Sequence, residues 1–145
     1  MGLFTSFDIN ASGMTAQRLR SDTISQNLAN IDTTRTAEGT PYVRKTVMFQ
    51  EKQNMDFDSI LMTTIGQIGD GVKVTSIIND TSTAMKQVYD PSHPDADENG
   101  YVLYPNVNTV TEMTNLIDAS RSYEANITAF NASKSMATSG LNIGK

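Results

Sequence analysis

Apolar residues recur at helical spacing over the first thirty positions of the chain. They follow one another at intervals of three, four and three residues, and proline is absent from this stretch. The positions that share this spacing are Phe4, Phe7, Ala11 and Met14. Such alternation places side chains along one face of an α-helix, and a second apolar line, interrupted by the polar residues Asn27 and Asn30, runs beside it. We therefore expect residues 1–33 to form a helix with more than one face that needs a partner.

The last forty positions carry the same signal over a longer span. The alternating line, with polar interruptions, comprises Met113, Leu116, Ser120, Tyr123, Ile127, Phe130, Lys134, Ala137 and Leu141. Thr109 and Glu112 have the spacing of a capping box, Asn108 is a competing cap, and Gly140 stands where a helix commonly ends. The sequence therefore predicts a long helix within residues 106–145, about 45 Å in length for roughly thirty residues at 1.5 Å each.

The stretch between the two predicted helices has a different character, because it holds all four prolines and most of the turn signals. Three runs rich in β-branched and aromatic residues are typical of strands. These runs are residues 42–49, 72–78 and 101–104. Asp70-Gly71 and Asn99-Gly100 precede the second and third runs, and such dipeptides favour tight turns. We therefore expect residues 34–105 to form a small β-rich domain.

Together these segments predict an α+β protein in which the long N- and C-terminal helices pair as a coiled-coil-like bundle, with a small β-rich middle domain. Two such helices can bury one seam against each other, but a β unit of about seventy residues cannot cover their remaining apolar faces. Asparagines on a helix seam fix register and partner at a cost in stability. We therefore expect the terminal helices to bind other chains. The residues expected at this interface are Phe4, Phe7, Ala11, Met14, Asn27, Leu28, Ala29, Asn30, Met113, Leu116, Tyr123, Asn126, Ile127 and Phe130.

Composition narrows the chemistry that the chain can perform. The absence of cysteine excludes thiolate nucleophiles and cysteine-ligated metals, and the single histidine, His93, excludes any site that needs two imidazoles. A net charge of −5 provides no cationic field for nucleic acid or anionic lipid. We find neither a Sec-type signal nor an apolar run near the ~20 residues that span a bilayer. We therefore expect no enzyme, no cofactor, no nucleic-acid partner and no direct membrane insertion.

The acidic segment 95–100 supports an alternative hypothesis, a calcium-dependent soluble binding module. Its side-chain oxygens at loop positions 1, 3 and 5 and its glycine at position 6 match the first half of a calcium loop. Asn106 stands at position 12, where a bidentate glutamate is required, so the main hypothesis includes no metal. A hydrolase centred on His93 is a weaker third hypothesis, because no oxyanion-hole motif accompanies the neighbouring Ser92.

The two ends of the chain resemble the paired signatures of bacterial flagellar rod and hook proteins. The first signature lies in residues 9–17 and 24–33, and the second lies in residues 112–117 and 120–126. Within this family the short chain, and the segment that begins at residues 89–94, resemble the C-type proximal rod subunits. The longer connection between Thr33 and Tyr42 also resembles the inserted forms of that type.

The resemblance implies a structural subunit that polymerises with itself and other rod subunits into the axial rod of the basal body. It further implies export through the flagellar type III apparatus without a cleaved signal peptide, and a location in the basal body within the periplasm or cell envelope. The assembled rod would act as a drive shaft that transmits torque.

Overall fold

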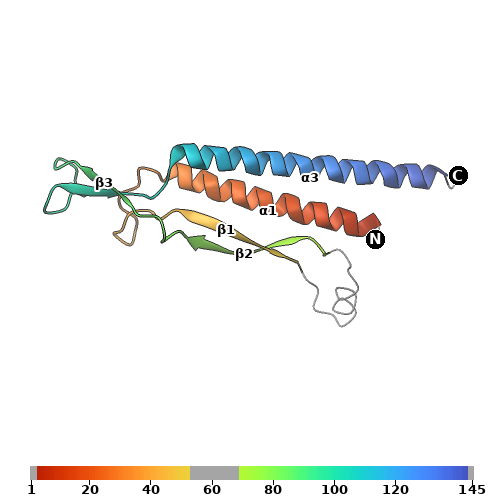
Figure 1. Ribbon diagram of the computed structural model, residues 1–145, viewed down its shortest axis with the longest axis horizontal. Helices are drawn as coiled ribbons and strands as arrows, with labels where there is room; N and C mark the ends of the chain where they lie inside the picture. The colour runs from red at the N-terminus through yellow and green to blue at the C-terminus, as the bar shows by residue number, and fades with distance from the viewer. Residues whose placement is uncertain (1–2, 53–68, 144–145) are drawn as a thin grey trace, which may run out of the picture.

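The computed structural model describes residues 3–52 and 69–143, in which two long terminal helices lie side by side, one small antiparallel sheet lies along the N-terminal helix and a second lies beyond one end of the helix pair (Figure 1). In chain order the elements are α1 (Leu3–Ala29), β1 (Lys45–Glu51), β2 (Val72–Asn79), β3 (Lys86–Tyr89), β4 (Tyr101–Tyr104) and α3 (Thr109–Ile143). The expected α+β class, with helices at both ends and strands in the middle, is confirmed.

The two helices lie side by side and run in opposite directions. Phe7, near the start of α1, packs against Phe130 of α3, whereas Asn27, near the end of α1, contacts Glu112 in the first turn of α3. Because α1 has 27 residues and α3 has 35, the C-terminal turns of α3 extend past the beginning of α1 (Figure 1).

The side of α3 that is shielded from solvent differs from the predicted apolar line at every second position. Its buried or half-buried residues that follow alternating four- and three-residue spacing are Glu112, Leu116, Ala119, Tyr123, Asn126, Phe130, Ser133 and Ala137. The predicted line shares Leu116, Tyr123, Phe130 and Ala137 with this seam, but four of its other positions are exposed: Met113, Ser120, Lys134 and Leu141. The seam is displaced because five of its eight members are small or polar, and a hydropathy pattern does not indicate that such residues are buried.

The ends of α3 also refine the sequence prediction. The backbone N–H groups of Val110 and Thr111 donate to Asn108 Oδ1 at 3.0 and 3.2 Å, so Asn108 is the N-terminal cap. The expectation that the helix ends near Gly140 is wrong, since Gly140 is helical and α3 continues to Ile143. A left-handed residue is not needed there because the helix does not turn back on itself.

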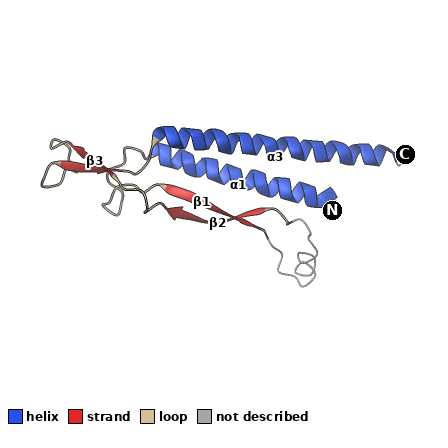
Figure 2. Cartoon of the chain, in the orientation of Figure 1, coloured by secondary structure: helices blue, strands red, loops and turns tan. Residues whose placement is uncertain are grey.

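The β1–β2 hairpin lies along α1 and is fastened to it at both ends (Figure 2). Lys45, at the start of β1, bonds through its backbone to Asn27, and the N–H of Val72, at the start of β2, donates to Ser12 Oγ at 3.0 Å. The fifteen residues from Ser12 to Asn27 span about 22 Å of helix, and six steps of strand span about 20 Å. The hairpin and the helix segment therefore match in length.

The β3–β4 sheet forms a separate unit at the far end of the hairpin (Figure 2). Val88 pairs with Val102, whose side chain is fully buried. Strand β3 is absent from the sequence prediction because Val88 and Tyr89 are too short a β-favouring run to stand out. Gly100 has a φ of +80°, and its N–H donates to the carbonyl of Asp97 at 2.9 Å, so the expected turn forms at the end of the 90–100 connection.

Candidate functional site

The residues predicted to form an interface on the terminal helices occupy three kinds of surroundings within the single chain. The exposed members are Phe4, Ala11, Ala29 and Met113. The half-buried members are Phe7, Met14, Leu28, Asn30, Leu116, Tyr123, Asn126, Ile127 and Phe130. One member, Asn27, is completely buried. Contacts within the chain thus use part of the predicted set, and the remainder faces outward.

Two close contacts join the N-terminal half of α1 to the C-terminal half of α3. The rings of Phe7 and Phe130 have their centroids 4.9 Å apart and are inclined by 58°. Further along α1, a Cβ atom added to Gly13 would lie 2.8 Å from Asn126 Oδ1. A side chain at position 13 would therefore require the Asn126 amide to move.

Large apolar side chains remain exposed on both terminal helices. Phe4 is 79% exposed on α1, and Val110, Met113 and Ile117 are 74%, 54% and 53% exposed on α3. The last three follow three- and four-residue spacing, so they form one face near the start of α3. The overhanging end of α3 adds two more exposed residues, Met136 and Leu141. Sequence reasoning did not single out Val110, Ile117 or Met136, although the spacing of the first two with Met113 was present in the sequence.

A buried polar junction joins α1, β1 and α3 at the level where the helices meet the strands. Asn27 donates from Nδ2 to the Lys45 carbonyl at 2.9 Å and to Glu112 Oε2 at 3.0 Å. Its Oδ1 accepts from the Tyr42 hydroxyl and from the Lys45 N–H, each at 2.9 Å. An asparagine amide has two donors and two acceptor lone pairs, so every hydrogen-bonding position of Asn27 is filled.

The charges at this junction are paired. Arg44 donates from Nε and Nη2 to Glu112 Oε1 at 2.9 and 2.8 Å, and Glu112 is fully buried. Burial lowers the pKa of Arg44, but its bonds and attraction to Glu112 and Asp80 outweigh that effect and leave the pKa raised. Burial, followed by the negative charge of Glu112, raises the pKa of Tyr42, so the Tyr42 hydroxyl keeps its proton for Asn27.

Asp80 and Asn106 extend the junction to the β segments. Asp80 forms an ion pair with Arg44, whose Nη1 lies 3.3 Å from the Asp80 carboxylate. Hydrogen bonds from Ser82, and then from Thr83, hold the pKa of the Asp80 carboxyl well below its usual value. Asn106 accepts from the Arg44 N–H and donates to the carbonyls of Asp80 and Thr83. Asn106 is therefore a structural link between loops. Its contacts are long-range, so nothing in the local sequence pattern indicated them.

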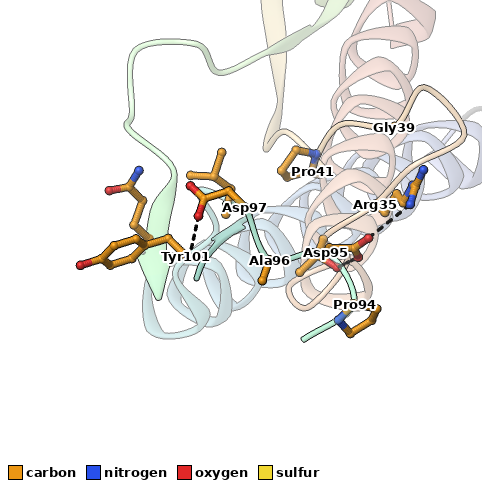
Figure 3. Close-up of a pocket in the computed structure, with 11 residues that line it drawn as sticks. Arg35, Gly39, Pro41, Pro94, Asp95, Ala96, Asp97 and Tyr101 are labelled. Atoms are coloured by element: carbon orange, nitrogen blue, oxygen red, sulfur yellow. Dashed lines mark hydrogen bonds and ion pairs between the residues drawn. The ribbon is translucent and has the colours of Figure 1, made fainter. Parts of the chain in front are cut away.

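The acidic loop predicted as the alternative metal site lines a cavity of about 340 Å³ beside Arg35 (Figure 3). Asp95 accepts from the Thr34 hydroxyl at 2.8 Å and pairs with Arg35 Nη1 at 3.5 Å. Asp97 Oδ1 accepts from the N–H groups of Asn99 and Tyr101, each at 2.9 Å. The chain's own donors thus engage both carboxylates. Among residues 3–52 and 69–143, no three His, Cys, Asp or Glu side chains are grouped so that they could hold a metal ion.

The Ser92–His93 pair is not arranged as a nucleophile and base. The hydroxyl of Ser92 donates to Asp90 at 2.6 Å, and His93 Nδ1 accepts from the backbone N–H of Asp95 at 3.1 Å. Both side chains therefore stabilise the local turns of the 90–100 connection.

Comparisons with known proteins give one consistent result. Residues 7–35 match a family model described as flagella basal body rod protein, and residues 98–143 match one described as flagellar basal body rod FlgEFG protein C-terminal. The chain is 49% identical to flagellar basal-body rod protein FlgC of Bacillus subtilis over 152 residues, which cover all of both chains. It is 48% identical to FlgC of Borreliella burgdorferi over 99% of this chain and 98% of that protein. It is 42% identical to FlgC of Salmonella typhimurium over the full length of both. Neither helix, as far as the structure describes it, is long and apolar enough to cross a membrane.

Proposed function

Because this chain belongs to the flagellar basal-body rod protein FlgC family and is a structural subunit of the basal-body rod, we propose that its terminal helices are the surfaces through which it assembles. Its place is the basal body, and its role is mechanical, not enzymatic. Second copies of the chain and other rod subunits are the proposed partners. The observation that carries the proposal is the set of exposed apolar side chains along α3, together with Phe4 on α1; Leu141 is 76% exposed and Phe4 is 79% exposed.

Burial of these side chains supplies the driving force for assembly. Removing one large apolar side chain from water stabilises an interface by roughly 1.5–3 kcal/mol. The face formed by Val110, Met113 and Ile117 and the overhanging turns with Met136 and Leu141 offer several such side chains per subunit. Head-to-tail contacts between unlike surfaces generate a helical assembly that continues to grow when the rotation between subunits does not close a ring.

The overhang of α3 is the part of the chain that most needs a neighbour. The shielded seam of α3 ends near Ala137, since α1 begins beside the preceding turns. Beyond that level no second helix within residues 3–52 and 69–143 covers Leu141. We therefore place a neighbouring subunit against these last turns, which continues the helix packing of one subunit into the next.

The same geometry supports a role as a drive-shaft component. Two long helices packed along their length resist bending, and assembly through them would carry torque from subunit to subunit. We also propose export through the flagellar type III apparatus without a cleaved signal peptide, and membership of a flagellar rod family supports this proposal. A strain that lacks that apparatus should retain the subunit in the cytoplasm, and the N-terminal peptide of subunits from purified basal bodies should begin at Met1 or Gly2.

The assembly proposal is tested by placing a charge on the overhang. Leu141→Asp removes an apolar contact and puts a carboxylate where we expect a neighbour, so rods should be absent from basal bodies and cells should not swim. The purified variant should unfold at the temperature of the wild type, since Leu141 is 76% exposed. Ser139→Asp, which introduces the same charge at an exposed polar position, is the matched control and should leave motility intact. Normal rods with Leu141→Asp would contradict the proposal.

A further inference from the structure

The helix seam has little intrinsic register. Leu116, Tyr123 and Phe130 recur every seven residues on the shielded side of α3, so sliding α3 by seven residues brings another bulky side chain to each level. Of the three intervening seam positions, Ala119 and Ser133 are small and offer no shape that opposes such a slip, whereas Asn126 lies against Gly13 and favours the native level. A seam of this kind stabilises pairing but discriminates weakly between registers.

The polar junction discriminates strongly, because its bonds can form at one level only. Asn27 fills all four hydrogen-bonding positions using Tyr42, Lys45 and Glu112. Arg44 supplies the two remaining bonds to Glu112. After a slip of seven residues, about 10 Å along the helix, Glu112 would lose Asn27 and Arg44 together. A buried carboxylate without partners is strongly unfavourable.

We propose that the Asn27–Glu112–Arg44 junction is a register lock, which fixes the level of α3 against α1 and against the β1–β2 hairpin. Lys45 is the residue that ties the hairpin into the lock, since both its N–H and its carbonyl bond to the Asn27 amide. The lock sets how far α3 projects past the start of α1, and hence where Met136 and Leu141 stand. The inference rests on contacts within one chain and does not depend on the assembly partners.

Disulfide trapping measures register directly, because the chain has no cysteine of its own. Gly13→Cys is combined with Asn126→Cys, which reports the native level. It is also combined with Ala119→Cys or Ser133→Cys, which report slips of seven residues in either direction, and these two chains carry Asn126→Ala so that the cysteine at position 13 meets no amide in the native register. Gly13 lies against Asn126 in the native register. A slip of about 10 Å exceeds the reach of a disulfide, whose Cα atoms lie at most about 7 Å apart. Mild oxidation of the dilute full-length chain, followed by mass analysis of the monomer, gives the fraction of each disulfide.

The three cysteine pairs are compared in three backgrounds. With the intact junction, the 13–126 disulfide should exceed either slipped disulfide by about tenfold or more, as expected when a slip leaves buried groups unpaired. The double variant Asn27→Leu with Glu112→Leu replaces the polar contact by an apolar one that still packs, and the slipped disulfides should rise toward the native one. Asn131→Leu with Glu124→Leu makes the same chemical changes at exposed positions of α3 and should keep the wild-type ratio.

Several results would overturn the lock. One is a wild-type ratio in the double variant, and another is slipped disulfides that form as readily as the native one in the intact chain. If the double variant loses its helical circular dichroism, the single variant Glu112→Gln decides, because it keeps the size of the side chain and removes the charge. Loss of helicity in both variants would also contradict the proposal, since the seam is argued to pair the helices without the lock.

Discussion

The aromatic rings of Phe7 and Phe130, which come from opposite ends of the chain, pack with their centroids 4.9 Å apart. This contact ties the first turns of α1 to the latter half of α3. Three residues earlier, Phe4 is 79% exposed, although it belongs to the same apolar line. One side chain of the line therefore serves the fold of the single chain, while the other is available to a neighbour.

Truncation of the ring pair should lower the stability of the single chain. In a double-mutant cycle, Phe7→Ala and Phe130→Ala should show a coupling of about 0.5–1.5 kcal/mol, as aromatic pairs do. Denaturant unfolding of the purified chain provides the measurement. Phe4→Ala is the control, and it should change stability by no more than about 0.5 kcal/mol. A coupling near zero would show that the rings are not paired in solution.

Replacing Gly71 with alanine should lower the stability of the chain more than replacing Gly39 with alanine, although both glycines have positive φ. Gly39 has a φ of +78° and nothing within 4 Å of an added Cβ, so Gly39→Ala should cost only backbone strain of about 1–2 kcal/mol. Gly71 has a φ of +107°, and its Cβ would meet Ser12 Oγ and come within 3.3 Å of Ile9 Cα. Gly71→Ala should therefore cost more, because it also pushes the hairpin away from α1. Equal losses in thermal unfolding would mean that the hairpin is not fastened there.

Asp80 should make the stability of the chain sensitive to acid. Its pKa is held below the ordinary value of about 3.9, chiefly by bonds from Ser82 and Thr83. A carboxyl with a depressed folded pKa stabilises the fold above the unfolded pKa, and this contribution is lost as pH falls through the folded pKa. Asp80→Asn should therefore have a smaller free energy of unfolding than the wild type at neutral pH, and the difference between the two free energies should shrink below about pH 4. A difference that stays constant between pH 7 and pH 2 would contradict this role.

Calcium should leave the chain unchanged. Asp95 is engaged by Thr34 and Arg35, and Asp97 by backbone N–H groups, so neither carboxylate is free to coordinate a cation without breaking these bonds. Thermal unfolding in millimolar calcium should match that in magnesium and in chelator. A rise in melting temperature that is specific to calcium would revive the binding-module alternative.

The sequence was sufficient to predict what depends on local pattern. Helical spacing predicted α1 and α3, and β-branched runs predicted strands near β1, β2 and β4. The apolar line predicted for α3 differs by one residue, at alternate positions, from the side of α3 that faces α1 in the structure. Glu112 is buried only because Asn27 and Arg44 meet its charge, and those partners lie far away along the chain.

The same limit explains what was missed at the site. Asn27 was expected on the interface as a polar seam residue, but its bonds to Tyr42 and Lys45 depend on how the hairpin docks. Arg44 and Asp80 carried no local signal, since their roles arise from segments brought together by the fold. Single-sequence pattern marks residues that repeat, and this junction is made of residues that do not.

The central claim, that exposed side chains on the terminal helices contact neighbouring subunits, is tested most directly by photocrosslinking in assembled basal bodies. The photoreactive analogue p-benzoylphenylalanine replaces Phe4 in one strain and Phe7 in another, and irradiated basal bodies are digested for mass spectrometry. At Phe7 the account predicts a crosslink to the peptide that contains Phe130 of the same chain, since the two rings are in contact. At Phe4, which is 79% exposed, it predicts a crosslink to a second copy or to another rod subunit. Intact rods in which Phe4 forms no crosslink to a second polypeptide would contradict the claim.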